Sequence, residues 1–435
     1  MTHYQEGVFK MDYQERIKWF KEARFGMFLH WGLYSQLAAT EWAFRLNNYT
    51  VKEYAKIAET FKPQNFDPDL WAKTAKKAGM KYMVFTTRHC DGFCLYDSRV
   101  SDFTSVKTAA KRDFTAEYAE ACRKAGLKVG FYYSLVDWRY KGGWDHDKYP
   151  ESAEAMVRQA HGQVRELMTN YGKIDILWYD ANKITDWKWE EGKQTVPEFW
   201  RSQELNEMVR KLQPHILINN RSGTGTGDFV TPERKIEAAD QGIAWESCLT
   251  MDPLSWGHVA YNPLKKSASQ VIRDLVEVAS GGGNMLLNTA PKADGSLVEC
   301  EVKSILEAGK WLKKNGQAIY GSVRSPLNAL NHYGPNGTFC RWIGSADPKV
   351  HYLALLGWFG SEFCTVRIDG EVESITMLAT GEDVQFRRES WGRLVLENLP
   401  VNPPDKHITM FKMKFKNIPK ITDLIPKGEL IESEL

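Results

Sequence analysis

The stretch KIDILWYDAN, residues 173–182, is an apolar run that ends in a bare carboxylate. Its branched and aromatic residues, from Ile174 to Tyr179, are typical of a strand buried on both faces. Asp180 stands at the C-terminal end of that strand. A buried strand tolerates a charge only where the charge meets a partner or a site, so the stretch raises the question of what Asp180 faces.

Six further short apolar runs interleave with helical segments before residue 315. They are FGMFLH (25–30), KYMVFTT (81–87), KVGFYYS (128–134), HILINN (215–220), IAWES (243–247) and GGNMLLN (282–288). The alternation predicts parallel strands covered by helices, and the count favours a (β/α)8-like TIM barrel with one irregular unit. The rival is a doubly wound open sheet. It is disfavoured because no G-x-G-x-x-G turn follows an early strand.

Residues typical of helix ends support this alternation of strands and helices. Asp67 is placed to cap a helix that starts at Pro68, and Gly79 stands where a left-handed C-cap belongs. Gly126 repeats the helix–Gly–strand pattern before residues 128–134. The barrel module therefore recurs at least twice.

After about residue 325 the pattern changes to short, partly alternating runs separated by turn residues. These are HYLALLGW (351–358), FCTVRID (363–369), SITMLAT (374–380), VQFRRE (384–389) and GRLVLENLP (392–400). They predict a small antiparallel β-sandwich. We therefore expect a catalytic barrel over residues 1–325 and a β-sandwich over residues 326–435.

Composition narrows the class of protein. The formal net charge of +2 gives no reason to expect nucleic acid or a membrane as partner. The sequence has no signal-peptide pattern, and its seven cysteines form no visible framework of pairs, so a reducing, cytoplasmic compartment is expected. The 16 Trp residues suit stacking on sugar rings as well as a core.

Polar side chains recur where the predicted strands end. The ends carry His30, Arg88 to Asp91, Tyr133, Asp180, Arg221 and Glu246. In a barrel, the C-terminal strand ends build the active site. One such residue is easily a helix cap or an ion-pair partner, but several at one mouth suit a neutral polyol ligand, because hydroxyls need donors and acceptors together.

Other chemistries find less support. Cys90 and Cys94 lack the partner motif of a structural zinc site, so no metal is expected. A Cys90 nucleophile paired with His30 or His89 has no local signature, and no G-x-S-x-G elbow is present. We expect no cofactor.

Glycoside hydrolysis needs a second carboxyl group opposite Asp180. The glycine-rich segment 221–247 reads as a mobile, exposed connection and offers Asp228, Glu233, Glu237, Asp240 and Glu246. The residues alone do not choose among them.

Six blocks resemble the retaining α-L-fucosidases of glycoside hydrolase family 29. They are WFKEARFGMFLHWGLYS (19–35), Glu41–Trp42, TRHCDGF (87–93), GFYYSLVDW (130–138), DILWYD (175–180) and GGNMLLNTAPKADGSL (282–297). The resemblance spans about residues 15–315 in the family's order. It implies double displacement on terminal α-L-fucosides, with Asp180 as nucleophile, Glu233 of TPE as acid/base and Glu246 in reserve.

The resemblance also implies the substrate contacts, on a fucosylated oligosaccharide or glycoside. They are His30, Glu41, Trp42, His89, Cys90, Tyr133, Trp178, Arg221 and Trp256. Cys90 stands where the family usually has a second His, and a thiol is a weaker hydrogen-bonding group. The alternatives are therefore a related sugar such as an α-L-galactoside, or a catalytically degenerate fucose-binding protein. The oligomeric state is not readable from the sequence.

Overall fold

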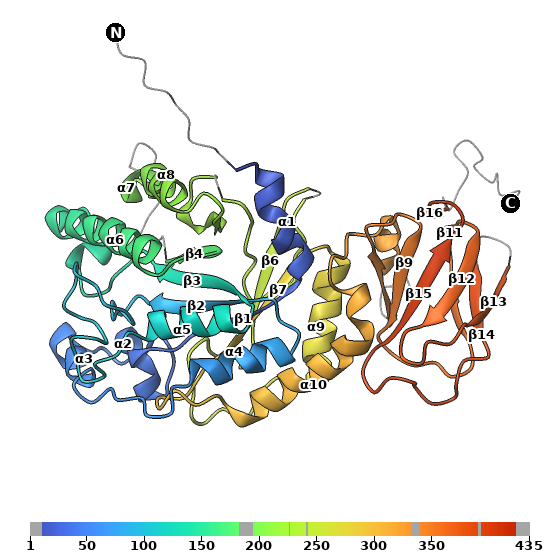
Figure 1. Ribbon diagram of the computed structural model, residues 1–435, viewed down its shortest axis with the longest axis horizontal. Coiled ribbons are helices and arrows are strands. Elements are labelled where there is room, and N and C mark those ends of the chain that lie inside the picture. The colour runs from blue at the N-terminus through green and yellow to red at the C-terminus, as the bar shows by residue number, and fades with distance from the viewer. Residues whose placement is uncertain are drawn as a thin grey trace, which may run out of the picture. The chain divides into compact units, whose positions relative to one another are not determined.

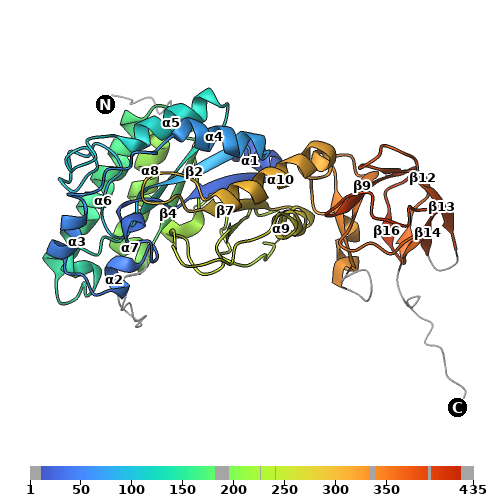
Figure 2. The same cartoon turned by 90° about the horizontal axis from the view of Figure 1, so that it is seen from below.

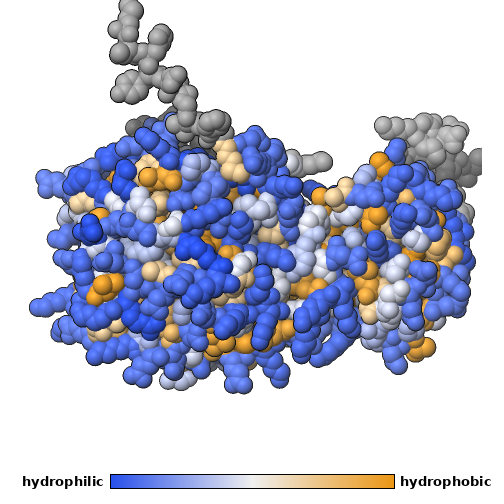
Figure 3. Space-filling model, viewed as in Figure 1, coloured by the Kyte–Doolittle hydropathy of each residue, from blue (hydrophilic) through white to orange (hydrophobic). Residues whose placement is uncertain are grey.

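The computed structural model describes residues 11–181, 195–225, 227–240, 242–332, 339–389 and 393–422. Within these ranges, no helix has the length and apolar character needed to cross a membrane. All seven cysteines are free thiols. The face drawn in Figure 3 is largely hydrophilic, with hydrophobic residues in scattered patches.

The chain divides into two compact units that interleave along the sequence. The first comprises residues 1–235, 239–266 and 284–306, and the second comprises residues 236–238, 267–283 and 307–435. The division expected from the sequence, with one boundary between the barrel at residues 1–325 and the sandwich at residues 326–435, remains a proposal.

A seven-stranded parallel sheet forms the centre of the first unit (Figure 1). Its strands are β1 (Phe25–Leu29), β2 (Tyr82–Arg88), β3 (Lys128–Ser134), β4 (Ile176–Asp180), β5 (Leu217–Ile218), β6 (Glu246–Thr250) and β7 (Asn284–Thr289). The spatial order is β5-β4-β3-β2-β1-β7-β6, so each strand lies beside its neighbour in the sequence and β7 pairs with β1. This circular order is that of a TIM-like barrel, which confirms the predicted fold class.

Residues 229–233 occupy the position between the two edge strands β5 and β6. Phe229 bridges Asn219 just after β5, while Val230 bridges Trp245 and Glu233 bridges Cys248 on the β6 side. The segment is the irregular unit of the barrel. Main-chain hydrogen bonds hold it, from the Val230 N–H to the Ala244 carbonyl and from the Glu246 N–H to the Val230 carbonyl, although it lies within the segment 221–247 that was expected to be a mobile connection.

Helices and short 3-10 turns connect these strands. The α-helices are α1 (Tyr13–Ala23), α2 (Ala43–Leu46), α3 (Val51–Ile57), α4 (Pro68–Lys77), α5 (Phe114–Lys124), α6 (Pro150–Asn170), α7 (Val196–Trp200), α8 (Ser202–Leu212), α9 (Ala268–Ser280) and α10 (Glu299–Asn315). The 3-10 turns are η1 (Leu33–Leu37), η2 (Lys141–Gly143), η3 (Asn220–Ser222), η4 (Gly316–Ala318) and η5 (Pro326–His332). Figures 1 and 2 show α4, α5, α6 and α8 along the outside of the parallel sheet.

Local chemistry explains where the helices begin and end. The Asp67 side chain accepts from the Leu70 N–H and Pro68 opens α4, as the sequence predicts. Gly79 and Gly126 follow α4 and α5 with φ of 85° and 67°, the left-handed conformation that favours glycine.

The second unit contains an antiparallel β-sandwich, as predicted. One sheet has the order β12-β15-β9-β8 and the other β10-β14-β13, beside a two-stranded β11-β16 pair. The strands are β8 (Cys340–Gly344), β9 (Val350–Leu355), β10 (Phe363–Thr365), β11 (Ile368–Asp369), β12 (Val372–Met377), β13 (Gln385–Arg388), β14 (Leu394–Glu397), β15 (Thr409–Phe415) and β16 (Lys420–Ile421).

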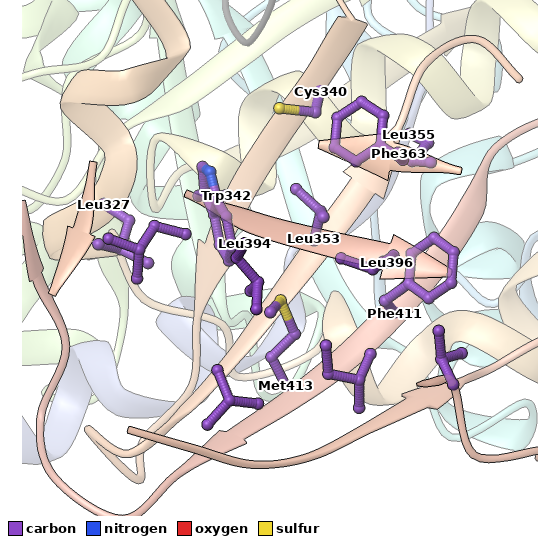
Figure 4. Close-up of a cluster of buried hydrophobic side chains, with 14 of the residues drawn as sticks. Leu327, Cys340, Trp342, Leu353, Leu355, Phe363, Leu394, Leu396, Phe411 and Met413 are labelled. Atoms are coloured by element: carbon purple, nitrogen blue, oxygen red, sulfur yellow. The ribbon is translucent and has the colours of Figure 1, made fainter. Parts of the chain in front are cut away.

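Buried apolar side chains from both sheets form the core of the sandwich. Figure 4 shows this cluster, which includes Leu327, Trp342, Leu353, Leu394, Leu396, Phe411 and Met413. Burial of such side chains, each worth about 1.5–3 kcal/mol, is what holds the two sheets together.

Candidate active site

A cavity of about 490 Å³ opens at the C-terminal ends of the barrel strands. Its lining includes ten of the twelve residues proposed as catalytic or substrate-binding: His30, Glu41, Trp42, His89, Cys90, Trp178, Asp180, Arg221, Glu233 and Trp256. Tyr133 and the reserve Glu246 do not line it. No group of three or more His, Cys, Asp or Glu suited to a metal ion occurs in the described part of the chain.

Asp180 ends β4 with its side chain 27% exposed. Arg221 donates from Nη1 to Oδ1 at 2.7 Å, and the Tyr132 hydroxyl donates to Oδ2 at 2.8 Å. Burial favours the neutral carboxyl, but the charge and hydrogen bond of Arg221 outweigh it and lower the pKa of Asp180. Asp180 is therefore an oriented, ionised carboxylate at the floor of the cavity.

Arg221 joins the two candidate catalytic carboxylates. Its Nη1 contacts Asp180, and its Nη2 lies 2.9 Å from Oε2 of Glu233, whose side chain is 43% exposed. The guanidinium is fixed because it lies 4.5 Å above the Trp178 ring and donates from Nε to Thr231 at 2.9 Å. Since both oxygens touch one planar guanidinium, the two carboxyl groups lie within about 8 Å of each other.

Glu233 has a second partner, Trp256, whose indole Nε1 donates to Oε1 at 3.2 Å. Trp256 also lies beside His30, with ring centroids 5.1 Å apart. Glu233 is thus held at the cavity edge by an Arg and a Trp, opposite the strand that carries Asp180.

His30 is a neutral hydrogen-bond acceptor toward the cavity. Burial, followed by the neighbouring His89, lowers its pKa to about 4. The amide nitrogen of Asn288 donates to the Trp256 carbonyl at 2.8 Å, so its Oδ1, 2.7 Å from His30 Nδ1, must accept from that nitrogen. The remaining ring nitrogen, Nε2, therefore has its lone pair available for a ligand hydroxyl.

Glu41 contributes a second acceptor. Its Oε2 accepts from the Ser255 hydroxyl at 2.9 Å and from the N–H groups of Trp256 and Gly257 at 3.1 and 2.8 Å. Burial acts against ionisation, but the Gly257 bond and the two nearby histidines lower the pKa of Glu41. Oε1 has no hydrogen-bond partner among the described residues, and it suits a donating hydroxyl.

Aromatic rings and a thiol complete the wall. His89 stacks on Tyr132 with 8° between the planes, and its buried Nδ1 has no hydrogen-bond partner in the described ranges. The Cys90 thiol lies 3.0 Å from the Ser134 hydroxyl. Burial raises the pKa of Cys90, so it is a neutral thiol and not a nucleophile.

The structure places Tyr133 outside the cavity lining. Its hydroxyl donates to Gln163 at 2.8 Å and contacts Arg88, on the side of β3 away from the cavity. The neighbouring Tyr132 faces the cavity instead and bonds Asp180, because successive strand residues point to opposite faces. A strand that is apolar on both faces gives no alternation from which to choose between the two tyrosines.

The reserve candidate Glu246 is also placed away from the cavity. It begins β6 instead of ending it, and its side chain is fully buried. It accepts from Trp178 Nε1 at 3.0 Å and from the Tyr82 hydroxyl. Burial raises its pKa to about 7. Glu246 therefore anchors the indole that lies under Arg221.

This placement gives a first testable prediction. We expect Glu246→Gln to retain kcat/KM within about threefold, because the amide can still accept from Trp178, whereas loss of a general acid costs about 10²–10⁴-fold. Glu246→Leu leaves the Trp178 and Tyr82 donors unpaired, and we expect a loss of about 2–4 kcal/mol of stability. Kinetics and thermal melts of both variants check this. A Gln variant that is folded but a hundredfold slower would return Glu246 to the acid/base role.

Several known proteins that are similar to this chain are α-L-fucosidases. The α-L-fucosidase family model matches residues 1–317. Bovine (Bos taurus) tissue α-L-fucosidase is 30% identical over 92% of this chain and 87% of its own length, and the human (Homo sapiens) enzyme is 31% identical over 89% and 85%. The solved α-L-fucosidase isoenzyme 1 of Paenibacillus thiaminolyticus is 35% identical, with a TM-score of 0.83 over 93% of this chain and all of its own.

A TIM-like barrel with carboxylates and aromatic rings at its mouth suits a glycoside hydrolase, and the relatives named above are glycoside hydrolases. The chain belongs to the α-L-fucosidase family of these enzymes, glycoside hydrolase family 29.

Proposed function

We propose that this protein is an exo-acting, retaining α-L-fucosidase that removes terminal fucose from fucosylated glycosides by double displacement. The observation that carries the proposal is the contact of one arginine, Arg221, with both Asp180 and Glu233 at the cavity. This arrangement supplies two carboxyl groups with different surroundings at one short distance, as a retaining glycosidase needs.

In the first step, an Asp180 oxygen attacks the anomeric carbon of the fucosyl residue. The bond to the leaving oxygen breaks, and that oxygen takes a proton from Glu233. In the second step, the Glu233 carboxylate takes a proton from water, whose oxygen attacks the anomeric carbon and releases Asp180. Both steps invert the anomeric carbon, so the product keeps the α-configuration of the substrate.

The remaining groups suit a sugar with several hydroxyls. His30 Nε2 and Glu41 Oε1 accept hydrogen bonds from hydroxyls, while the Trp256 indole contributes apolar surface to the cavity wall. The test is release of nitrophenol from p-nitrophenyl α-L-fucoside, beside a panel that includes the α-L-galactoside. Faster turnover of the galactoside would assign the alternative sugar, with the small Cys90 side chain as the first residue to examine.

The pH profile tests the contact between Arg221 and Asp180. Because the folded protein lowers the pKa of Asp180, the nucleophile stays ionised through its ordinary range near 3.8 and loses activity by protonation only below it. Arg221→Met removes the main cause, so we expect the acid limb of kcat/KM to move to higher pH. Arg221→Lys, which keeps the charge, should move it less. An unchanged limb in the Met variant would contradict this assignment.

A further inference from the structure

The loop that follows β6, residues 251–266, places a wall of the cavity beside Glu233. Its Trp256 lines the cavity and donates from Nε1 to the Glu233 carboxylate at 3.2 Å. The N–H groups of Trp256 and Gly257 also donate to Oε2 of Glu41 at 3.1 and 2.8 Å. The position of this segment, called the Trp256 loop below, therefore sets the surroundings of two of the carboxylates that line the cavity.

A buried ion pair closes the base of the Trp256 loop. Asp252 near its start and Lys265 near its end form a salt bridge, and their side chains are only 2% and 9% exposed. Asp252 Oδ1 also accepts from Asn262 Nδ2 at 2.5 Å and from the Leu254 N–H at 2.8 Å. Desolvation offsets much of the attraction in a buried pair, but neither charge can leave the other without becoming unpaired. The pair therefore fixes the geometry of the loop.

Lys265 also connects the loop to the barrel. Its Nζ lies 3.7 Å from Oε1 of Glu301 in α10, whose side chain is 1% exposed. Oε2 of Glu301 accepts at 2.5 Å from the hydroxyl of Thr289, the last residue of β7. The preceding residue, Asn288, donates to the Trp256 carbonyl at 2.8 Å. The Lys265 ammonium thus lies between a carboxylate of the loop and a carboxylate held by a barrel strand.

The packing of the loop on Glu41 leaves little room for displacement. A Cβ atom added at Gly257 would lie 2.7 Å from the main-chain nitrogen of Glu41 and 3.2 Å from its Cα and Cβ atoms. A movement of the loop away from Glu41 would lengthen the hydrogen bonds from Trp256 and Gly257. Misplacement of a site by about 1 Å can lower a rate about 10²-fold, so the position of this loop matters for the reaction.

We propose that Lys265 is a positioning residue: its contacts with the two buried carboxylates fix the Trp256 loop and so hold Trp256 against Glu233 and Glu41. Without the ammonium, these two carboxylates have no cation between them, and the loop moves away from the barrel. Glu233 then loses its hold on the position from which it donates a proton. This inference rests on the proposed function, because it concerns the same acid/base residue.

The test compares two substrates that differ in their need for a proton. The leaving oxygen of a fucosyl disaccharide needs protonation, whereas the leaving group of α-L-fucosyl fluoride needs little. We expect Lys265→Met to lower kcat/KM about tenfold more for the disaccharide than for the fluoride. Lys265→Arg keeps the charge and should restore most of the difference. The ratio of the two kcat/KM values does not depend on the folded fraction, so a loss of stability alone cannot change it.

Two further variants show what loop displacement and lost stability each look like. Gly257→Ala forces the loop off Glu41 without removing a charge, and it should change the ratio in the same direction as Lys265→Met. Arg341→Met is the matched control, because it removes a largely buried ion pair within the second compact unit. Arg341 Nε lies 2.5 Å from Glu277 Oε2, and the side chains are 16% and 22% exposed. This variant should lower Tm and leave the ratio unchanged.

An unchanged ratio in Lys265→Met, or the same change in Arg341→Met, would overturn the role of Lys265. If Lys265→Met does not fold, Asp252→Asn takes its place under the same criterion, since it keeps an oxygen acceptor for Leu254 and Asn262 and removes one charge of the pair. Failure of the wild type to hydrolyse either substrate is a different result, because it would contradict the proposed function itself.

Discussion

Asp180→Ala is expected to hydrolyse p-nitrophenyl α-L-fucoside on the order of 10⁴-fold more slowly than the wild type, with its fold intact. The substitution removes the attacking oxygen, so the covalent intermediate cannot form. It also leaves Arg221 without one of its two carboxylate partners. Steady-state kinetics, with circular dichroism and thermal melts to confirm folding, measure the effect.

The matched control is a second aspartate near the same strand, Asp175. Asp175 precedes β4 and pairs with Lys128 at 3.1 Å, away from the cavity. Asp175→Asn should cost stability and leave the chemical step nearly unchanged. Azide adds a sharper criterion: in Asp180→Ala it can replace the missing nucleophile and yield the β-fucosyl azide. A slow variant that gives only the α-azide would contradict the role of Asp180.

Glu233→Ala carries the second largest expected effect. Without proton donation, we expect kcat/KM for a fucosyl disaccharide to fall about 10²–10⁴-fold, and much less for α-L-fucosyl fluoride, whose leaving group needs little protonation. Azide should accelerate the second step and give the α-fucosyl azide, because it attacks the fucosyl-enzyme from the side that Glu233 normally assists. The two azide products thus separate the two carboxylates.

Glu237→Ala is the control for that experiment, since Glu237 is an exposed carboxylate four residues away that does not line the cavity. It should behave as the wild type on both substrates. If Glu233→Ala lost the same factor on the disaccharide and on the fluoride, Glu233 would be holding Arg221 in place and not donating a proton.

The architecture was predictable because it rests on repeated local signals. Buried parallel strands read as apolar runs, and Asp67, Pro68 and Gly79 mark helix ends by capping chemistry and backbone conformation. The irregular unit of the barrel was harder to predict from the sequence. Residues 229–233 carry few apolar residues, and their place between β5 and β6 depends on pairing with distant strands.

The site was predictable to the extent that strand ends converge in a barrel. Asp180, His30 and Arg221 follow strands, and they meet in one cavity. Tyr132 was missed because the choice between it and Tyr133 depends on which face of β3 points inward. That orientation is set by register with β2 and β4, and no local pattern in a doubly buried strand reveals it.

Glu246 and Glu233 show that the role of a carboxylate can be assigned only when the structure shows its surroundings. In the sequence, Glu246 stands near the end of the run IAWES, but it begins β6 and its carboxylate accepts from Trp178. Glu233 reads as a loop residue, yet its main chain bridges Cys248.

Covalent trapping tests the central claim most directly. 2-Fluoro-fucosyl fluoride has a good leaving group, and its fluorine slows both steps, so a retaining enzyme accumulates the fucosyl-enzyme. Peptide mass spectrometry then locates the sugar. The double-displacement account predicts a single 2-fluoro-fucosyl adduct on Asp180, absent from Asp180→Ala. An adduct on another residue, or turnover of p-nitrophenyl α-L-fucoside with inversion and without any adduct, would contradict it.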